Sequence, residues 1–335
     1  GDGAVVTLNN CEIDMEGIPA FTSHGIYTYN SGKVVVNGGE YMNRATDQAS
    51  SGASVINGAV EVNAGTFSGR IENYYGTPVL KGGTFSVKPN DKFIAAGYKA
   101  VEVKGGYMVV PENVSVVYGD AVTAAIKGEN ATVYVMPNED DSAILLEGKL
   151  SMAKGVTLKG MGETPVKLFN DWGSNAFANQ AHFTNTHIEN IHFTNNLIID
   201  AGIANGDVKF VNCVFGGDLA HQGVHFDSGN GIITFENCTF VGRNMFGSSL
   251  ENVVFNNCTF LNKKSSQTGA DKWTGVNMWG KYEFNNCTFD TEAHCNVKCD
   301  GVVAVFNNCE CDDNRDITAI IQNTPGYNAE IIFNE

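Results

Sequence analysis

Residues 233–240 of this chain read Ile-Thr-Phe-Glu-Asn-Cys-Thr-Phe. Apolar side chains alternate with polar ones on both sides of Glu236-Asn237, which indicates two short strands. The alternation slips by one residue at that dipeptide, so the chain must bend tightly there if both apolar sides are to face one core. A bend this short needs a residue near the left-handed backbone region, which Asn and Gly tolerate best. We therefore predict two strands joined by a tight bend at Asn237.

The same pattern recurs along the chain at intervals that fit a solenoid. In the second half the bend asparagine is expected at Asn190, Asn212, Asn237, Asn257, Asn286 and Asn308, in steps of 22, 25, 20, 29 and 22 residues. A first-half version places the bend at Asn10, Gly38, Ala64 and Gly82. Such a repeat fits one coil of three short strands, stacked on the next coil at about 4.8 Å. We predict an all-β, right-handed parallel β-helix with an asparagine ladder, its hand following the preference of parallel crossovers.

The cysteines fit the same scheme. Of the eight cysteines in the second half, five directly follow the predicted bend, namely Cys213, Cys238, Cys258, Cys287 and Cys309. We expect them to pack as small buried hydrophobic residues. The odd count and the placement one coil apart argue against a disulfide framework. A link between Cys295 and Cys299, or between Cys309 and Cys311, remains an alternative, and these are also the pairs that come nearest to the spacing of a zinc site.

The repeat pattern lapses in the middle of the chain, which suggests a domain boundary. Two apolar runs on either side of residues 104–106, Lys-Gly-Gly, predict a hairpin that would cap a first solenoid. A short helix is predicted at 120–126, with Asp120 as its N-cap. We therefore expect two β-helical domains. Residues 1–112 would end in the hairpin cap, and residues 113–335 would begin with the helix cap.

Composition excludes several functional classes. Lys and Arg number 21 against 37 Asp and Glu, giving a formal net charge of −16, which lacks the basic footprint of a nucleic-acid-binding protein. No apolar run approaches the ~18–20 residues of a membrane span. A hydrophobic content of 43% with 20 Phe excludes a disordered chain. We expect a monomer without a membrane span, nucleic acid, metal or cofactor.

The chain resembles the pectate-lyase-like superfamily of right-handed β-helices over roughly residues 130–335. The resemblance rests on Thr-Val-Tyr-Val at 132–135, on Gly-Val-Thr-Leu-Lys-Gly at 155–160 and on the Asn-Cys-Thr-Phe coils. In the first half, the Gly-Gly-Thr-Phe copies and residues 94–100 look like repeats in large surface proteins of gut bacteria. Since that superfamily includes lyases, hydrolases, esterases, phage tailspikes and adhesins, the resemblance implies a fold and a secreted or cell-surface location, but no single function.

One predicted outward face gathers polar and aromatic side chains. Strands about ten residues before the bend should bury Val224 and Phe226 and turn their neighbours outward. The expected ligand-binding residues are His225, Asp227, Asn277, Trp279 and Lys298, accompanied by Asn296 and by His221 in the adjoining loop. Aromatic faces stack on pyranose rings while carboxylates and amides bind hydroxyls, so this face predicts carbohydrate binding. The alternative is a surface His–Asp pair beside a tryptophan that a loop covers.

The catalytic residues that the resemblance implies are missing from the sequence. A pectate-lyase-type enzyme should bring a calcium-binding Asp cluster beside an Arg or Lys base, and none of the four Arg lies in a predicted strand beside paired Asp. The pairs Asp140-Asp141 and Asp312-Asp313 lie in polar stretches typical of solvated loops, with a calcium site as the alternative. We expect a non-enzymatic secreted or cell-surface protein that acts in adhesion or carbohydrate contact. A polysaccharide lyase or glycoside hydrolase with a diverged site, and a trimeric phage tail-fibre segment, are the alternatives.

Overall fold

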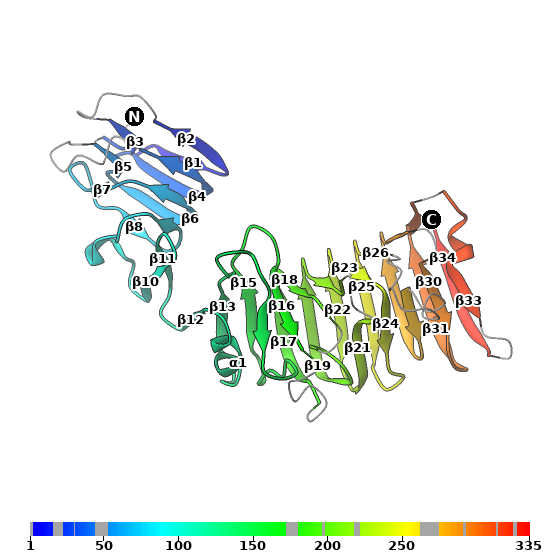
Figure 1. The fold of residues 1–335 in the computed structure, drawn as a ribbon. Coiled ribbons are helices and arrows are strands. Elements are labelled where there is room, and N and C mark those ends of the chain that lie inside the picture. The colour runs from blue at the N-terminus through cyan, green and yellow to red at the C-terminus, as the bar shows by residue number, and fades with distance from the viewer. Residues whose placement is uncertain are drawn as a thin grey trace. The chain divides into compact units, whose positions relative to one another are not determined.

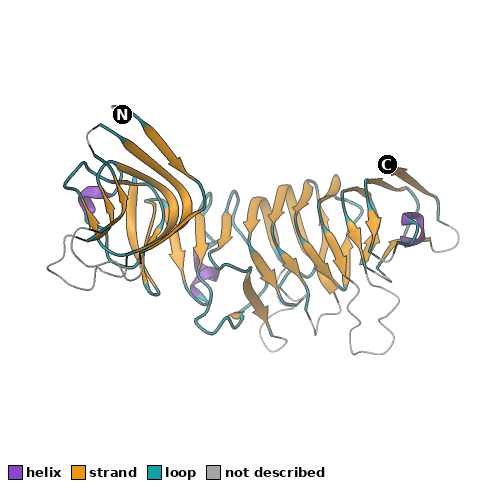
Figure 2. Ribbon diagram, turned by 90° about the horizontal axis from the view of Figure 1, so that it is seen from above, coloured by secondary structure: helices purple, strands orange, loops and turns teal. Residues whose placement is uncertain are grey.

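The computed structural model describes residues 3–15, 23–29, 31–43, 53–171, 180–195, 198–217, 222–261, 275–290, 293–312, 314–323 and 327–335. The chain divides into two compact units, residues 1–114 and 115–335. Both units are all-β with predominantly parallel strand pairing, as the orange strands of Figure 2 show. Within the described residues, no helix has the length and apolar character needed to cross a membrane.

Unit 1 contains two sheets. The larger contains β1 (Val5–Leu8), β2 (Cys11–Asp14), β4 (Lys33–Met42), β6 (Val60–Ser68), β8 (Val79–Leu80), β9 (Thr84–Phe85), β10 (Tyr98–Val103) and β11 (Gly106–Pro111), and the smaller contains β3 (His24–Tyr27), β5 (Ser54–Asn57) and β7 (Ile71–Glu72). A 3-10 helix spans Asp91–Phe93. Strands β10 and β11 form the hairpin expected around Lys-Gly-Gly, and β11 also pairs with β9 in antiparallel fashion. The hairpin therefore covers an edge that β9 would otherwise expose.

Unit 2 contains two parallel sheets formed by successive repeats of the chain, whose strands are numbered in Figure 1. Its larger sheet contains β12 (Val114–Val117), β13 (Thr132–Val135), β15 (Thr157–Gly160), β17 (His182–Glu189), β19 (Gly202–Val211), β21 (Gln222–Gly229), β22 (Ile232–Glu236), β24 (Arg243–Phe246), β25 (Asn252–Asn256), β27 (Gly275–Met278), β28 (Lys281–Asn285), β30 (His294–Val297), β31 (Val302–Asn307), β33 (Ile321–Asn323) and β34 (Ala329–Asn334). The other contains β14 (Ile144–Leu146), β16 (Val166–Asn170), β18 (Ile191–Phe193), β20 (Val214–Phe215), β23 (Thr239–Val241), β26 (Thr259–Leu261), β29 (Thr288–Phe289) and β32 (Glu310–Cys311). Strands of successive repeats pair in parallel, as β22 does with β25 and β25 with β28.

The bend asparagines of unit 2 adopt the predicted backbone conformation. All six have φ between 48° and 56°, in the left-handed region. Their backbone amides form one file, because the N–H of Asn237 donates to Asn256 O at 2.9 Å and that of Asn257 donates to Asn285 O at 2.8 Å. The side-chain ladder, however, runs mainly one residue earlier than predicted. Its Nδ2-to-Oδ1 hydrogen bonds of 2.7–2.9 Å join Asn256, Asn285, Asn307 and Asn334.

The glycine bends of unit 1 are displaced from their predicted positions. The left-handed residues are Gly39, Gly65 and Gly83, with φ of 105°, 120° and 96°. The prediction of Gly38 and Gly82 is therefore wrong by one residue. At Gly39 a Cβ atom would lie 2.1 Å from Cys11 O in the preceding coil, so this position accepts only glycine.

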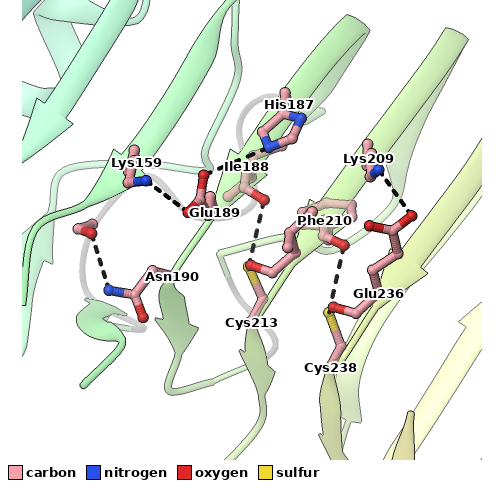
Figure 3. Close-up of polar contacts among 12 residues, drawn as sticks. Lys159, His187, Ile188, Glu189, Asn190, Lys209, Phe210, Cys213, Glu236 and Cys238 are labelled. Carbon is pink, nitrogen blue, oxygen red and sulfur yellow. Dashed lines mark hydrogen bonds and ion pairs between the residues drawn. The ribbon is translucent and has the colours of Figure 1, made fainter. Parts of the chain in front are cut away.

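Phenylalanine and cysteine files fill the core of unit 2. The predicted column from Phe193 to Phe289 stacks ring on ring at 4.8–5.0 Å between centroids. A second column from Phe210 to Phe306 does the same at 4.5–5.2 Å. Beside them, the Cys238 thiol donates to Phe210 O at 3.6 Å (Figure 3). All nine cysteines lie in described residues and none forms a disulfide, so both disulfide alternatives are wrong.

The short helix α1 (Ala121–Ala125) begins where the sequence predicts it, but without the predicted cap. The Asp120 side chain makes no capping hydrogen bond. The reason is conformational: Asp120 has φ −65° and ψ −15°, which is itself helical, whereas a capping residue normally has extended backbone.

Candidate functional site

The predicted polar face lies on four neighbouring strands of unit 2, β21, β24, β27 and β30. Parallel pairing sets its outward residues in two rows. The first row consists of His225, Met245, Asn277 and Asn296. The second row, two residues further along, consists of Asp227, Gly247, Trp279 and Lys298. The alternate residues, such as Phe226, Val276 and Met278, are completely buried in the core. We call these eight outward residues the two-row face.

A cavity of about 330 Å³ opens at one end of the two-row face. It is lined by His225, Asp227, Met245, Phe246, Gly247, Ser248 and Trp279. Three side chains chosen from the sequence alone therefore share one cavity. Its lining offers an indole, an imidazole, a carboxylate and a hydroxyl to a small polar molecule.

Behind the cavity, His225 is held by a charged pair. Its Nδ1 lies 2.9 Å from Asp200 Oδ1, and the second carboxylate oxygen of Asp200 lies 3.7 Å from Lys149 Nζ. These side chains are 18%, 23% and 6% exposed for His225, Asp200 and Lys149 respectively. The hydrogen bond with His225 lowers the pKa of Asp200, and Lys149 acts in the same direction, although burial opposes both. The other ring nitrogen, Nε2, lies 3.9 Å from Asp227 Oδ1 at the cavity.

The backbone beside Asp200 is strained. Ala201 has φ 51°, a left-handed conformation that costs a residue with a Cβ atom about 1–2 kcal/mol. Its N–H lies 3.4 Å from His225 Nδ1, and it also helps to hold the pKa of Asp200 low. The strained turn thus places a backbone donor at the contact between His225 and Asp200.

A buried tyrosine fixes two segments of the cavity wall. The Tyr282 hydroxyl donates to Phe246 O at 2.9 Å and accepts from Trp279 N–H at 3.0 Å. Its side chain is buried, and burial raises its pKa. Tyr282 therefore ties the backbone of Trp279 to the strand that forms the cavity floor.

The remaining predicted site residues are not in the cavity. We expect Asn277 to face solvent, but in the middle of the first row, between Met245 and Asn296, it is only 2% exposed. Lys298 is half-buried beside Trp279. His221 lies outside the described residues.

Sequence reasoning missed three residues that support the cavity: Asp200, Lys149 and Tyr282. The available signal for Asp200 was its position 25 residues before His225, about one coil. Lys149 lies outside the repeat, so its sequence position alone did not indicate a contact with Asp200. Tyr282 has the apolar position of a strand residue, and only the coordinates show where its hydroxyl points.

The acidic pairs considered for calcium make contacts within the protein. Asp140 accepts from Ser142 N–H at 3.0 Å, and Asp141 forms an ion pair with Lys167. Asp313 lies outside the described residues. Across the described part of the chain, no group of three His, Cys, Asp or Glu side chains is placed to hold a metal ion.

Comparison with known proteins gave no match to this chain. No protein-family model matches the chain. Searches of curated proteins and of solved structures likewise gave no match. The geometry of the two-row face is therefore what indicates a function for this chain.

Proposed function

We propose that unit 2 is a right-handed parallel β-helix whose two-row face binds carbohydrate, in a secreted or cell-surface protein that acts in adhesion or glycan contact. The coil-by-coil parallel pairing and the asparagine file support the β-helix. The outward face of such a coil stack is a rigid surface, which suits a site that must be ready before its ligand arrives.

The observation that carries this proposal is the shared cavity of Trp279, His225 and Asp227. An indole offers a flat apolar surface to a sugar ring, while the imidazole and carboxylate beside it bind ring hydroxyls. The cavity of about 330 Å³ has the size of a small ligand pocket. Tyr282 and Asp200 hold the lining side chains or their backbone in place, so little ordering is needed when a ligand binds.

The test is a glycan-binding screen with matched variants. We expect Trp279→Ala to weaken binding about 10- to 100-fold, the equivalent of one buried aromatic side chain. Tyr118→Ala removes an aromatic residue of unit 2 that is exposed at 42% and lies far along the chain from the face, and it serves as the control. Binding that is equal in the wild type and Trp279→Ala would remove the proposed site.

Cleavage of the bound glycan is a second candidate function, favoured by the 2.9 Å contact between His225 and Asp200. A histidine held by a carboxylate is a common general acid or base. This function predicts turnover of acidic or neutral glycans that disappears in His225→Ala or Asp227→Ala. Binding without turnover would favour the non-enzymatic function.

We also propose that the protein is a monomer in solution, which light scattering tests directly. A stable trimer would instead favour a tail-fibre segment. Surface labelling of intact cells tests the proposed location, and protein found only inside cells would contradict it.

A further inference from the structure

Next to the two-row face lies an arginine for which the described residues supply no ion-pair partner. Arg243 precedes Met245 by two residues on β24, so it projects from the same side of the strand. Its Nε atom is buried and has no hydrogen-bond partner. Burial alone lowers the pKa of Arg243, with no contribution from a carboxylate within the described residues. A desolvated guanidinium without a counter-charge is costly in the absence of a ligand.

Two amides beside Arg243 are also unsatisfied. Asn277 and Asn296 are 2% and 3% exposed, and they are adjacent in the first row. Within the part of the chain that the structure describes, neither Asn277 Oδ1 nor Asn296 Nδ2 has a hydrogen-bond partner. Because buried polar atoms in proteins are nearly always hydrogen-bonded, one lone acceptor next to one lone donor requires an explanation.

A second cation, Lys298, lies close to the same two amides. Lys298 follows Asn296 by two residues and lies beside Trp279 in the second row. Burial lowers the pKa of Lys298, and the charge of Arg243 lowers it further. Arg243 lies two residues before the first row on β24, and Lys298 lies two residues after it, directly beyond the end of β30, so the two cations flank the buried amides. An anion bound between them would interact favourably with both charges.

We propose that Arg243, Lys298 and Asn296 bind an acidic group, a carboxylate or a sulfate, on the glycan held at Trp279. A planar guanidinium binds such a group in bidentate fashion, while the Asn296 amide donates to it. Asn277 Oδ1 needs a donor, which a sugar hydroxyl supplies and a bare inorganic anion does not. The inference rests on the proposed function and narrows its ligand class to anionic glycans.

The experiment compares each acidic oligosaccharide with its own neutral form. Hyaluronan oligosaccharides carry only carboxylates and are paired with their carboxyl-reduced form, and carrageenan oligosaccharides carry only sulfates and are paired with their desulfated form. We expect the wild type to prefer at least one acidic member over its neutral partner by ten-fold or more, less so in 0.5 M than in 0.15 M salt. The pair that shows the preference identifies the acidic group.

Variants then assign the preference to residues. Arg243→Gln and Lys298→Met should each remove most of the preference, while Lys154→Met, at an exposed lysine of unit 2, should leave it intact. Because Arg243 is half-buried and has no ion-pair partner among the described residues, Arg243→Gln should not lower the urea midpoint of unfolding. A marked loss of stability would indicate a structural role instead and would overturn the assignment.

Failure of this inference differs from failure of the proposed function. Binding that depends on Trp279 but is equal for acidic and neutral partners overturns the anionic ligand class and leaves carbohydrate binding standing. The absence of any binding that depends on Trp279, across the screen and both pairs, overturns both.

Discussion

His225 Nδ1 lies 2.9 Å from Asp200 Oδ1, one coil earlier in the chain. The same carboxylate is the counter-charge of Lys149, whose side chain is only 6% exposed. Asp200 therefore has two roles: it orients the imidazole at the cavity and it compensates a buried ammonium. The two roles predict a measurable dependence on pH.

Asp200→Asn should destabilise the protein by about 1–3 kcal/mol at pH 7, because it weakens a charged hydrogen bond and leaves Lys149 without a counter-charge. The folded-state pKa of Asp200 is depressed, so its contribution is fully present above the unfolded pKa of about 3.9 and is lost as pH falls through the lower folded value. Urea unfolding of the wild type and Asp200→Asn, at pH 7 and below pH 4, measures the difference in their free energies of unfolding. An equal penalty at both pH values would show that the charge of Asp200 contributes nothing.

Ala201→Gly should stabilise the protein by about 0.5–1 kcal/mol. Glycine removes the cost of the left-handed backbone at φ 51°, and part of that gain is offset by its greater freedom when unfolded. Thermal or urea unfolding measures the change. Ala204→Gly, at a buried strand position of the same coil, is the control and should destabilise.

Tyr282→Phe should cost about 1–3 kcal/mol, because Phe246 O loses a donor and Trp279 N–H loses an acceptor. Tyr282 acts on the ligand only through the backbone of Trp279, so glycan affinity should fall less than in Trp279→Ala. Calorimetric binding and unfolding measurements on both variants give the two quantities. A loss of affinity as large as that of Trp279→Ala would mean that the hydroxyl touches the ligand.

Asn237→Ala should destabilise by about 1 kcal/mol, since alanine tolerates φ 52° poorly, whereas Asn237→Gly should stay within about 0.5 kcal/mol of the wild type. Urea unfolding of the pair separates backbone conformation from side-chain bonding. If glycine were as damaging as alanine, the side chain of Asn237 and not its φ would be what stabilises the bend.

Thiol labelling should distinguish the buried cysteines from the others. In the native state we expect labelling only at the partly exposed Cys11, Cys299 and Cys309, and after denaturation without reductant at all nine. Burial raises the pKa of Cys299, so its labelling should be slow at pH 7 and should accelerate as pH rises above 9. Mass spectrometry counts the labels. Fewer than nine after denaturation would reveal a disulfide.

The repeat could be predicted from the sequence because it is local. Alternation and the slip at Glu236-Asn237 depend only on neighbouring residues, and the left-handed φ of Asn237 is confirmed. The Gly38-Gly39 bend was placed one residue early because both glycines tolerate the conformation. Only the close approach of Cys11 O in the adjacent coil selects Gly39.

The cavity could be predicted only in part. His225, Asp227 and Trp279 share a face because strands of successive repeats pair in parallel and in register. Lys149 reaches Asp200 from outside the repeat, so no spacing rule indicated it. Alternation along one strand predicts on which side of the sheet Asn277 lies, but it does not predict whether other residues cover the side chain. The burial of Asn277 therefore could not be predicted.

The unequal steps of 20 to 29 residues between successive bend asparagines leave their hydrogen-bonded file intact. The differences in length therefore fall in the segments between the bends, and the position of each asparagine in the file does not change. New segments can be inserted or removed during evolution one turn at a time, and specificity can diversify while the scaffold beneath it stays the same.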